Sequence, residues 1–152
     1  MAAHRFIPRF RALAILAVVA GAGATIAGIA GLLATAALAA GAIGCGFGAA
    51  YLLSPTWRIA VEAGSDALRV TRGKKELFAL PWAEVEQVVA SPSTSTCFVD
   101  GGDPERSLLV PGFGAPASYD ITNKATLVAS ILEAVPSERV TEVETLDRYQ
   151  SS

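Results

Sequence analysis

The chain has 152 residues, of which 12 are lysine or arginine and 14 are aspartate or glutamate, and 52% of its residues are hydrophobic. This length allows one modest domain with an accessory element and excludes several full domains. The net charge is −2, and the hydrophobic share exceeds the ~45–50% of ordinary soluble chains.

The hydrophobic excess is concentrated in residues 12–53, which follow a basic N-terminal tail of residues 1–11. The block contains no charged residue, histidine, asparagine or glutamine. As one straight helix it would measure about 63 Å, roughly twice the hydrocarbon core of a bilayer. The block therefore predicts a two-helix transmembrane hairpin, with helices at residues 12–30 and 32–53 and a tight glycine-containing turn between them.

A cleaved signal peptide is the alternative interpretation of the first segment. The arginines of the tail would form its basic region, residues 12–20 its apolar core and residues 22–24 its cleavage site. Residues 25–53 would then still be long enough to span a membrane once. Both interpretations predict an integral membrane protein.

The residues that flank the block predict its orientation. Basic residues precede it and also follow it closely, from Arg58 onward, and such residues favour the cytoplasmic side. We therefore expect a multi-pass protein of the inner (plasma) membrane with a cytoplasmic soluble domain. Tyr51 and Trp57 lie where interfacial aromatic anchors are typical.

Small residues inside the block favour close approach of two helix backbones. The hairpin packing against itself is the simpler use of such a face, and self-association is the other. Gly41 also belongs to these small-residue faces, and the glycines expected at helix contacts are Gly21, Gly28, Gly31, Gly44 and Gly48.

The pattern of apolar and polar residues at positions 57–136 predicts one mostly β (α+β) domain. Apolar and polar residues alternate in short runs that are bounded by glycine, proline and aspartate, as in half-buried antiparallel strands. The predicted strands cover residues 57–62, 68–72, 76–80, 86–91, 95–100, 106–110 and 118–121.

A C-terminal amphipathic helix is predicted after these strands. Its apolar residues recur at helical spacing, Thr122 is the expected N-cap and Pro136 the stop. The apolar stripe of such a helix requires a cover, which the sheet would supply. Residues 137–152 are polar and acidic, and we expect a flexible tail there.

The order of these elements resembles that of bacterial membrane proteins in which a transmembrane hairpin precedes a pleckstrin-homology-like (PH-like) domain. The likeness is most specific at residues 80–88, LPWAEVEQV, where proline and tryptophan are followed by spaced aliphatic residues. It covers residues 12–136 and implies six or seven short antiparallel strands followed by one C-terminal amphipathic helix. The second PH-like copy that some of these proteins have is missing.

The sequence offers no catalytic constellation. The single histidine, His4, precedes the apolar block, and Cys45 and Cys97 have neither a CxxC partner nor a nearby histidine. We therefore expect no enzyme activity, no catalytic or metal-binding residues and no cofactor.

One basic cluster, formed by Arg69, Arg72, Lys74 and Lys75, is the candidate site for contact with lipid or a partner. A solvated strand edge is the simpler interpretation. Residues 57–152 hold nine basic and fourteen acidic residues, which disfavours generic attraction of the whole domain to anionic lipid or to nucleic acid. The sequence thus predicts a membrane-anchored, non-catalytic interaction module whose partners are the lipid bilayer and another protein or a second copy. Anionic headgroup binding and an oligomeric membrane structure are the alternatives.

Overall fold

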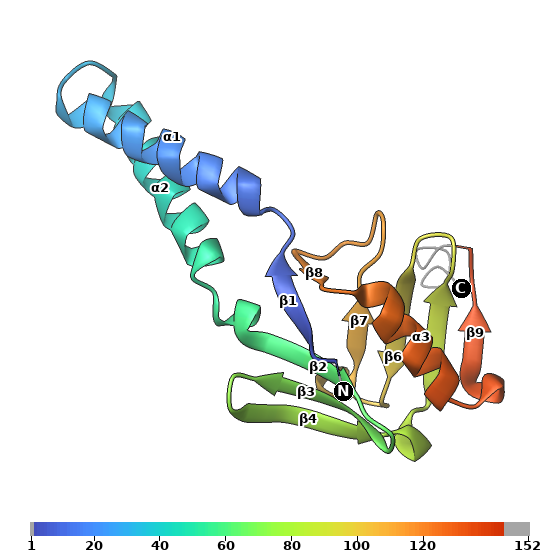
Figure 1. The fold of residues 1–152 in the computed structure, drawn as a ribbon. Helices are drawn as coiled ribbons and strands as arrows, with labels where there is room; N and C mark the ends of the chain where they lie inside the picture. The colour runs from blue at the N-terminus through green and yellow to red at the C-terminus, as the bar shows by residue number, and fades with distance from the viewer. Residues whose placement is uncertain (1, 145–152) are drawn as a thin grey trace. The chain divides into compact units, whose positions relative to one another are not determined.

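The computed structural model describes residues 2–144, and the chain divides into two compact units (Figure 1). One unit is the continuous segment Pro8–Pro55. The other combines the residues up to Ile7 with those from Thr56 onward, so that the second unit is built from both flanks of the first.

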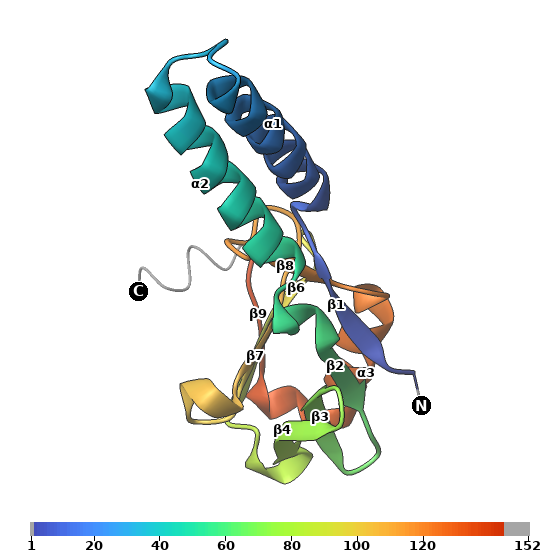
Figure 2. The ribbon, with the colours of Figure 1, turned by 90° about the vertical axis from the view of Figure 1, so that its left-hand side faces the viewer.

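The first unit is a helical hairpin. Helices α1 (Arg11–Ile29) and α2 (Thr35–Leu52) run side by side in both views (Figures 1 and 2). The turn between them contains Gly31 at φ +74°, in the left-handed region that glycine adopts without a steric penalty. Two long apolar N-terminal helices are thus confirmed, with bounds within a few residues of those expected.

The second unit contains two sheets. The five-stranded sheet has the strand order β4-β3-β2-β1-β8, and its strands that follow one another along the chain from β2 to β4 are antiparallel. Its members are β1 (His4–Pro8), β2 (Ile59–Ala63), β3 (Ala67–Arg72), β4 (Lys75–Pro81) and β8 (Tyr119–Ile121).

Strand β1 was not expected, because the sequence was interpreted as a basic tail over residues 1–11. Its side chains alternate, with His4 and Phe6 buried and Arg5 and Ile7 exposed. It pairs antiparallel with β2, with Arg5 opposite Ala60. Five residues next to a long apolar block give too short a pattern to predict a strand whose partner lies beyond that block.

The four-stranded sheet has the order β7-β6-β5-β9. Its strands are β5 (Gln87–Ser91), β6 (Thr96–Asp100), β7 (Leu108–Val110) and β9 (Val140–Glu142). Strand β9 pairs parallel to β5 within the segment expected to be a tail, and the rest of that tail, residues 145–152, lies outside the described residues.

Four short 3₁₀ helices complete the connections: η1 (Pro55–Arg58), η2 (Trp82–Glu84), η3 (Pro104–Arg106) and η4 (Ser137–Arg139). The strand predicted from residue 57 therefore begins only at Ile59, after η1. The Arg139 guanidinium donates hydrogen bonds to the carbonyl oxygens of Ala83 and Val85 at 2.8 and 2.7 Å. These bonds tie η4 to the connection between the two sheets and direct β9 alongside β5.

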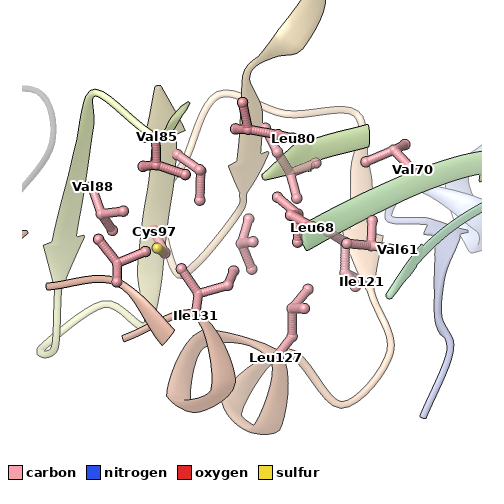
Figure 3. Packing of buried hydrophobic residues seen from close by; sticks show 14 of the residues in the cluster. Val61, Leu68, Val70, Leu80, Val85, Val88, Cys97, Ile121, Leu127 and Ile131 are labelled. Atoms are coloured by element: carbon pink, nitrogen blue, oxygen red, sulfur yellow. The ribbon is translucent and has the colours of Figure 1, made fainter. Parts of the chain in front are cut away.

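Helix α3 (Lys124–Ala134) covers the apolar core of this unit, with Leu127 and Ile131 fully buried (Figure 3). It ends before Pro136 as expected, but Thr122 is not its N-cap. That position belongs to Asn123, and the Thr122 hydroxyl accepts a hydrogen bond from the Arg5 amide instead. The mostly β region with a C-terminal helix, an α+β arrangement, is thus confirmed.

Candidate functional site

The hairpin exposes most of its apolar surface. Only 11% of the most apolar stretch of each helix is buried, and both helices are long and apolar enough to cross a membrane by length and composition. A helix of a water-soluble core would bury such side chains, since full burial of one is worth about 1.5–3 kcal/mol. The exposed large residues include Leu13, Leu16, Val19, Ile26, Ile29, Leu32, Ile43, Phe47 and Leu53.

Glycines bring the two helix backbones together. A Cβ atom added to Gly21 would lie 2.5 Å from the Gly41 carbonyl oxygen, and one added to Gly48 would lie 2.8 Å from the Ala14 carbonyl oxygen. Gly28 packs in the same way against Leu38. Gly41, which the sequence interpretation also placed on a small-residue face, lies seven residues before Gly48, or two helical turns away.

The other two expected contact glycines lie elsewhere. Gly31 belongs to the turn, and a Cβ atom on Gly44 would meet no other atom within 4 Å. The interface therefore uses three of the five glycines that were expected, together with Gly41. The face that carries Gly44 is not filled by the partner helix.

Two side-chain hydroxyls within the hairpin form hydrogen bonds to its backbone. The Thr25 hydroxyl donates to the Gly21 carbonyl oxygen at 2.8 Å, and the Tyr51 hydroxyl accepts from the Phe10 amide at 3.1 Å. Tyr51 thus connects the end of α2 to the residue before α1. Trp57, the other expected anchor, packs against the core of the β unit.

Most of the predicted basic cluster lies at one end of the five-stranded sheet, which we call the hairpin end. It is the end where β1 finishes at Pro8 and β2 starts at Ile59. The register places Arg72 opposite both Ile59 and Lys75, so the β3–β4 turn with Lys74 lies there too. The Gly73 amide donates to the Arg58 carbonyl oxygen at 3.0 Å, which fixes the turn beside the first strand residues after the hairpin.

Arg58 thus joins the cluster, and Arg69 leaves it. Arg69 lies opposite Glu62 and forms an exposed ion pair with Asp66 at 3.5 Å, near the β2–β3 turn. That turn is at the opposite end of the sheet, which we call the far end. The sequence grouped Arg69 with the lysines because they are close along the chain, whereas the strand separates them.

An exposed aromatic residue is held on a well-anchored loop between β7 and β8. Pro111 is fully buried, Gly112 packs against Thr94 and Thr96, and the Phe113 amide donates to the Thr94 carbonyl oxygen at 2.9 Å. The Phe113 side chain itself is 87% exposed. The sequence interpretation saw an irregular connection here and did not single out Phe113.

The groups with chemical potential have structural roles. The buried His4 donates from Nδ1 to the Thr122 carbonyl oxygen at 2.9 Å, since a carbonyl only accepts. Cys97 is fully buried, and burial raises its pKa to about 12, so it is a poor nucleophile near neutral pH. Within residues 2–144, no three His, Cys, Asp or Glu side chains are grouped to hold a metal ion.

Comparison of the chain with protein-family models, with curated proteins and with solved structures found no match in any of the three. The features of the chain that bear on its function are an exposed apolar hairpin, a basic sheet end and an exposed aromatic loop.

Proposed function

We propose that this protein is a membrane-anchored, non-catalytic interaction module. In this proposal α1 and α2 span the inner (plasma) membrane as a hairpin, and a PH-like domain at the cytoplasmic face binds a protein partner. The order of the elements supports the PH-like assignment, because β2 to β4 and β5 to β7 form two successive antiparallel sets and α3 covers their common core.

The observation that carries this proposal is the pairing of β1 with β2. Strand β1 precedes the hairpin and β2 follows it, yet both belong to one sheet, with His4 opposite Val61. A chain segment that enters a bilayer and returns to the same sheet must cross an even number of times. Two spans satisfy this requirement, and one span does not.

The same pairing argues against the signal-peptide alternative. Cleavage after residues 22–24 would remove β1 from its place between β2 and β8. The buried Phe6, which stacks on Tyr119 with ring centroids 4.3 Å apart, would be lost from the core as well. Retention of the N-terminus keeps basic residues on both flanks of the hairpin, which favours the cytoplasmic side for both.

Phe113 is the residue at which we expect a protein partner to bind, because exposed aromatic side chains on anchored backbone are typical of interaction surfaces. Its loop is fixed at Pro111 and Gly112, so binding does not have to order the backbone. A small conformational cost of this kind favours affinity.

In-cell photo-crosslinking of the full chain tests this role. A photoreactive residue at Phe113 is expected to give a defined protein adduct, whereas the same residue at Thr126, exposed on α3, gives none. Adducts that arise only from hairpin positions such as Phe47 would instead indicate the alternative, an oligomeric membrane structure. The isolated fragment 57–152 is unsuitable for this test, because it lacks β1.

A further inference from the structure

Short linkers tie the hairpin end of the domain to the helices. Strand β1 ends at Pro8 and α1 begins at Arg11, so two residues separate them. An extended chain advances at most about 3.6 Å per residue, which limits the distance from Pro8 to Arg11 to roughly 11 Å. On the other flank, η1 occupies part of the connection from Leu52 to Ile59.

The hairpin end presents four exposed cations: Arg58, Arg72, Lys74 and Lys75. Within residues 2–144, none of their side chains forms an ion pair or a hydrogen bond with another side chain. Glu76 is the carboxylate next to them, opposite Thr71. The hairpin end of this sheet is therefore strongly positive, although the whole domain carries an excess of acidic residues.

The far end has the opposite character. Asp66 lies in the β2–β3 turn, and its carbonyl oxygen accepts from the Trp82 amide at 3.2 Å, which brings the residues after β4 to the same end. Glu84 and Glu86 follow Trp82 in the sequence and are exposed. Of the basic residues here, Arg69 and Arg106 are paired with Asp66 and Glu84, and Arg139 donates hydrogen bonds to the carbonyl oxygens of Ala83 and Val85. The sheet is thus polarised, with unpaired cations at one end and carboxylates at the other.

We propose that the hairpin end docks on the anionic surface of the leaflet that α1 and α2 enter, and that Arg58, Arg72, Lys74 and Lys75 contact its phosphate groups. This inference rests on the proposed membrane insertion of the hairpin. The docking surface includes Arg58, which the cluster predicted from the sequence lacked, and it excludes Arg69, which that cluster contained. The docked domain presents its far end to the cytoplasm.

Charge complementarity and tethering support a bilayer as the occupant of this surface. A Lys or Arg close to an anionic leaflet gains an attraction equivalent to about a fivefold shift in equilibrium, and the attraction decays within a Debye length of roughly 10 Å. The linker holds Pro8, the last residue of β1, within roughly such a distance of the first residue of α1. In the reversed orientation the carboxylates of the far end would approach the same anionic surface and be repelled by it, which favours the docked orientation.

The test uses the full-length protein in vesicles of phosphatidylcholine alone or with about one third phosphatidylglycerol. A fluorophore is attached at Leu77→Cys, exposed on β4 close to the turn, or at Ser65→Cys in the far-end turn. Spin-labelled headgroups quench a fluorophore that comes close to the surface. We expect quenching at position 77 to rise with phosphatidylglycerol and to fall with added salt, while position 65 stays unquenched.

Two arginines on β3 provide a matched pair of variants. Arg72→Gln, at the hairpin end, is expected to lower the ratio of quenched to unquenched fluorophore about fivefold. Arg69→Gln, three residues away at the far end, is expected to leave it unchanged. Both side chains are exposed, and the ion pair lost with Arg69 is of the weak surface kind, so both variants should fold.

The outcomes separate the docking inference from the proposed function. Quenching at position 77 that is equal in neutral and anionic vesicles, or equal effects of Arg69→Gln and Arg72→Gln, would overturn docking while the protein still resists alkaline extraction from the vesicles. Release of the protein by alkaline extraction would contradict membrane insertion itself, and docking with it.

Discussion

Replacement of Phe6 by alanine examines whether the segment before the hairpin is part of the domain. Phe6 is only 7% exposed, belongs to the core that includes Val61 and Ile121, and stacks on Tyr119 with an interplanar angle of 8°. Truncation of a buried phenylalanine costs about 3–5 kcal/mol. A domain of this size has an unfolding free energy of roughly 5–15 kcal/mol, so we expect Phe6→Ala to remove about a fifth or more of it.

Urea unfolding of the full chain in detergent measures this loss. The two tryptophans, Trp57 and Trp82, both lie in the β unit, so intrinsic fluorescence follows that unit and not the hairpin. With a denaturant slope of about 1–3 kcal/mol/M, the midpoint should fall by at least about 1 M.

Ile7→Ala is the matched control. Ile7 is the next residue of the same strand but points away from the core and is 42% exposed. Its truncation should change the unfolding free energy by less than about 1 kcal/mol. Equal midpoints for Phe6→Ala and Ile7→Ala would show that β1 does not contribute to the folded domain, and the even number of crossings would lose its basis.

Three further changes test the packing. Gly21→Ala should destabilise the hairpin by about 1–3 kcal/mol, because the added Cβ atom would meet the backbone of α2. Gly23→Ala is the control, since its Cβ atom would lie in open space. An SDS titration followed by circular dichroism measures both, and a larger loss for Gly23→Ala than for Gly21→Ala would refute the interface. Arg139→Gln should lower the urea midpoint by the equivalent of about 1.5–3 kcal/mol, and an unchanged midpoint would mean that η4 does not anchor β9. Cys97 should not affect the unfolding free energy below pH 9.0, where its thiol is protonated in both the folded and the unfolded chain. Above pH 9.0 the unfolded thiol loses its proton, whereas the folded thiol keeps it up to its raised pKa of about 12, so the unfolding free energy should fall as the pH rises. The unfolding free energy should fall by at most about 1.4 kcal/mol per pH unit. The same pH dependence in Cys97→Ala would contradict the assignment of this fall to Cys97.

The sequence predicted the parts of the fold that depend on local pattern. The apolar block gave both helices of the hairpin, because an uninterrupted run of that length has few alternatives. Period-2 alternation identified β3 to β6 within a few residues, and the helical spacing of Leu127 and Ile131 gave α3. These elements carry their signal within a few neighbouring residues.

The parts that were missed depend on distant partners. Strands β1 and β9 are short, and each lies beside a strand some fifty residues away in the sequence. Thr122 has the side chain of a good N-cap, but the nearby β1 offers it the Arg5 amide instead. The cluster at the hairpin end likewise follows from register, which joins Arg58 to the β3–β4 turn and separates Arg69 from it.

In the proposed topology, the two flanks of the hairpin form one domain on one side of a membrane. Labelling of single cysteines with a membrane-impermeant maleimide tests it in right-side-out and inverted vesicles. Suitable positions are Ala2, Ser65 and Leu32, all exposed. The native Cys97 is too buried to interfere, and the partly buried Cys45 is replaced by alanine in every variant. We predict that Ala2→Cys and Ser65→Cys react from the same side and Leu32→Cys from the opposite side. Labelling of Ala2→Cys and Ser65→Cys from opposite sides would contradict the account.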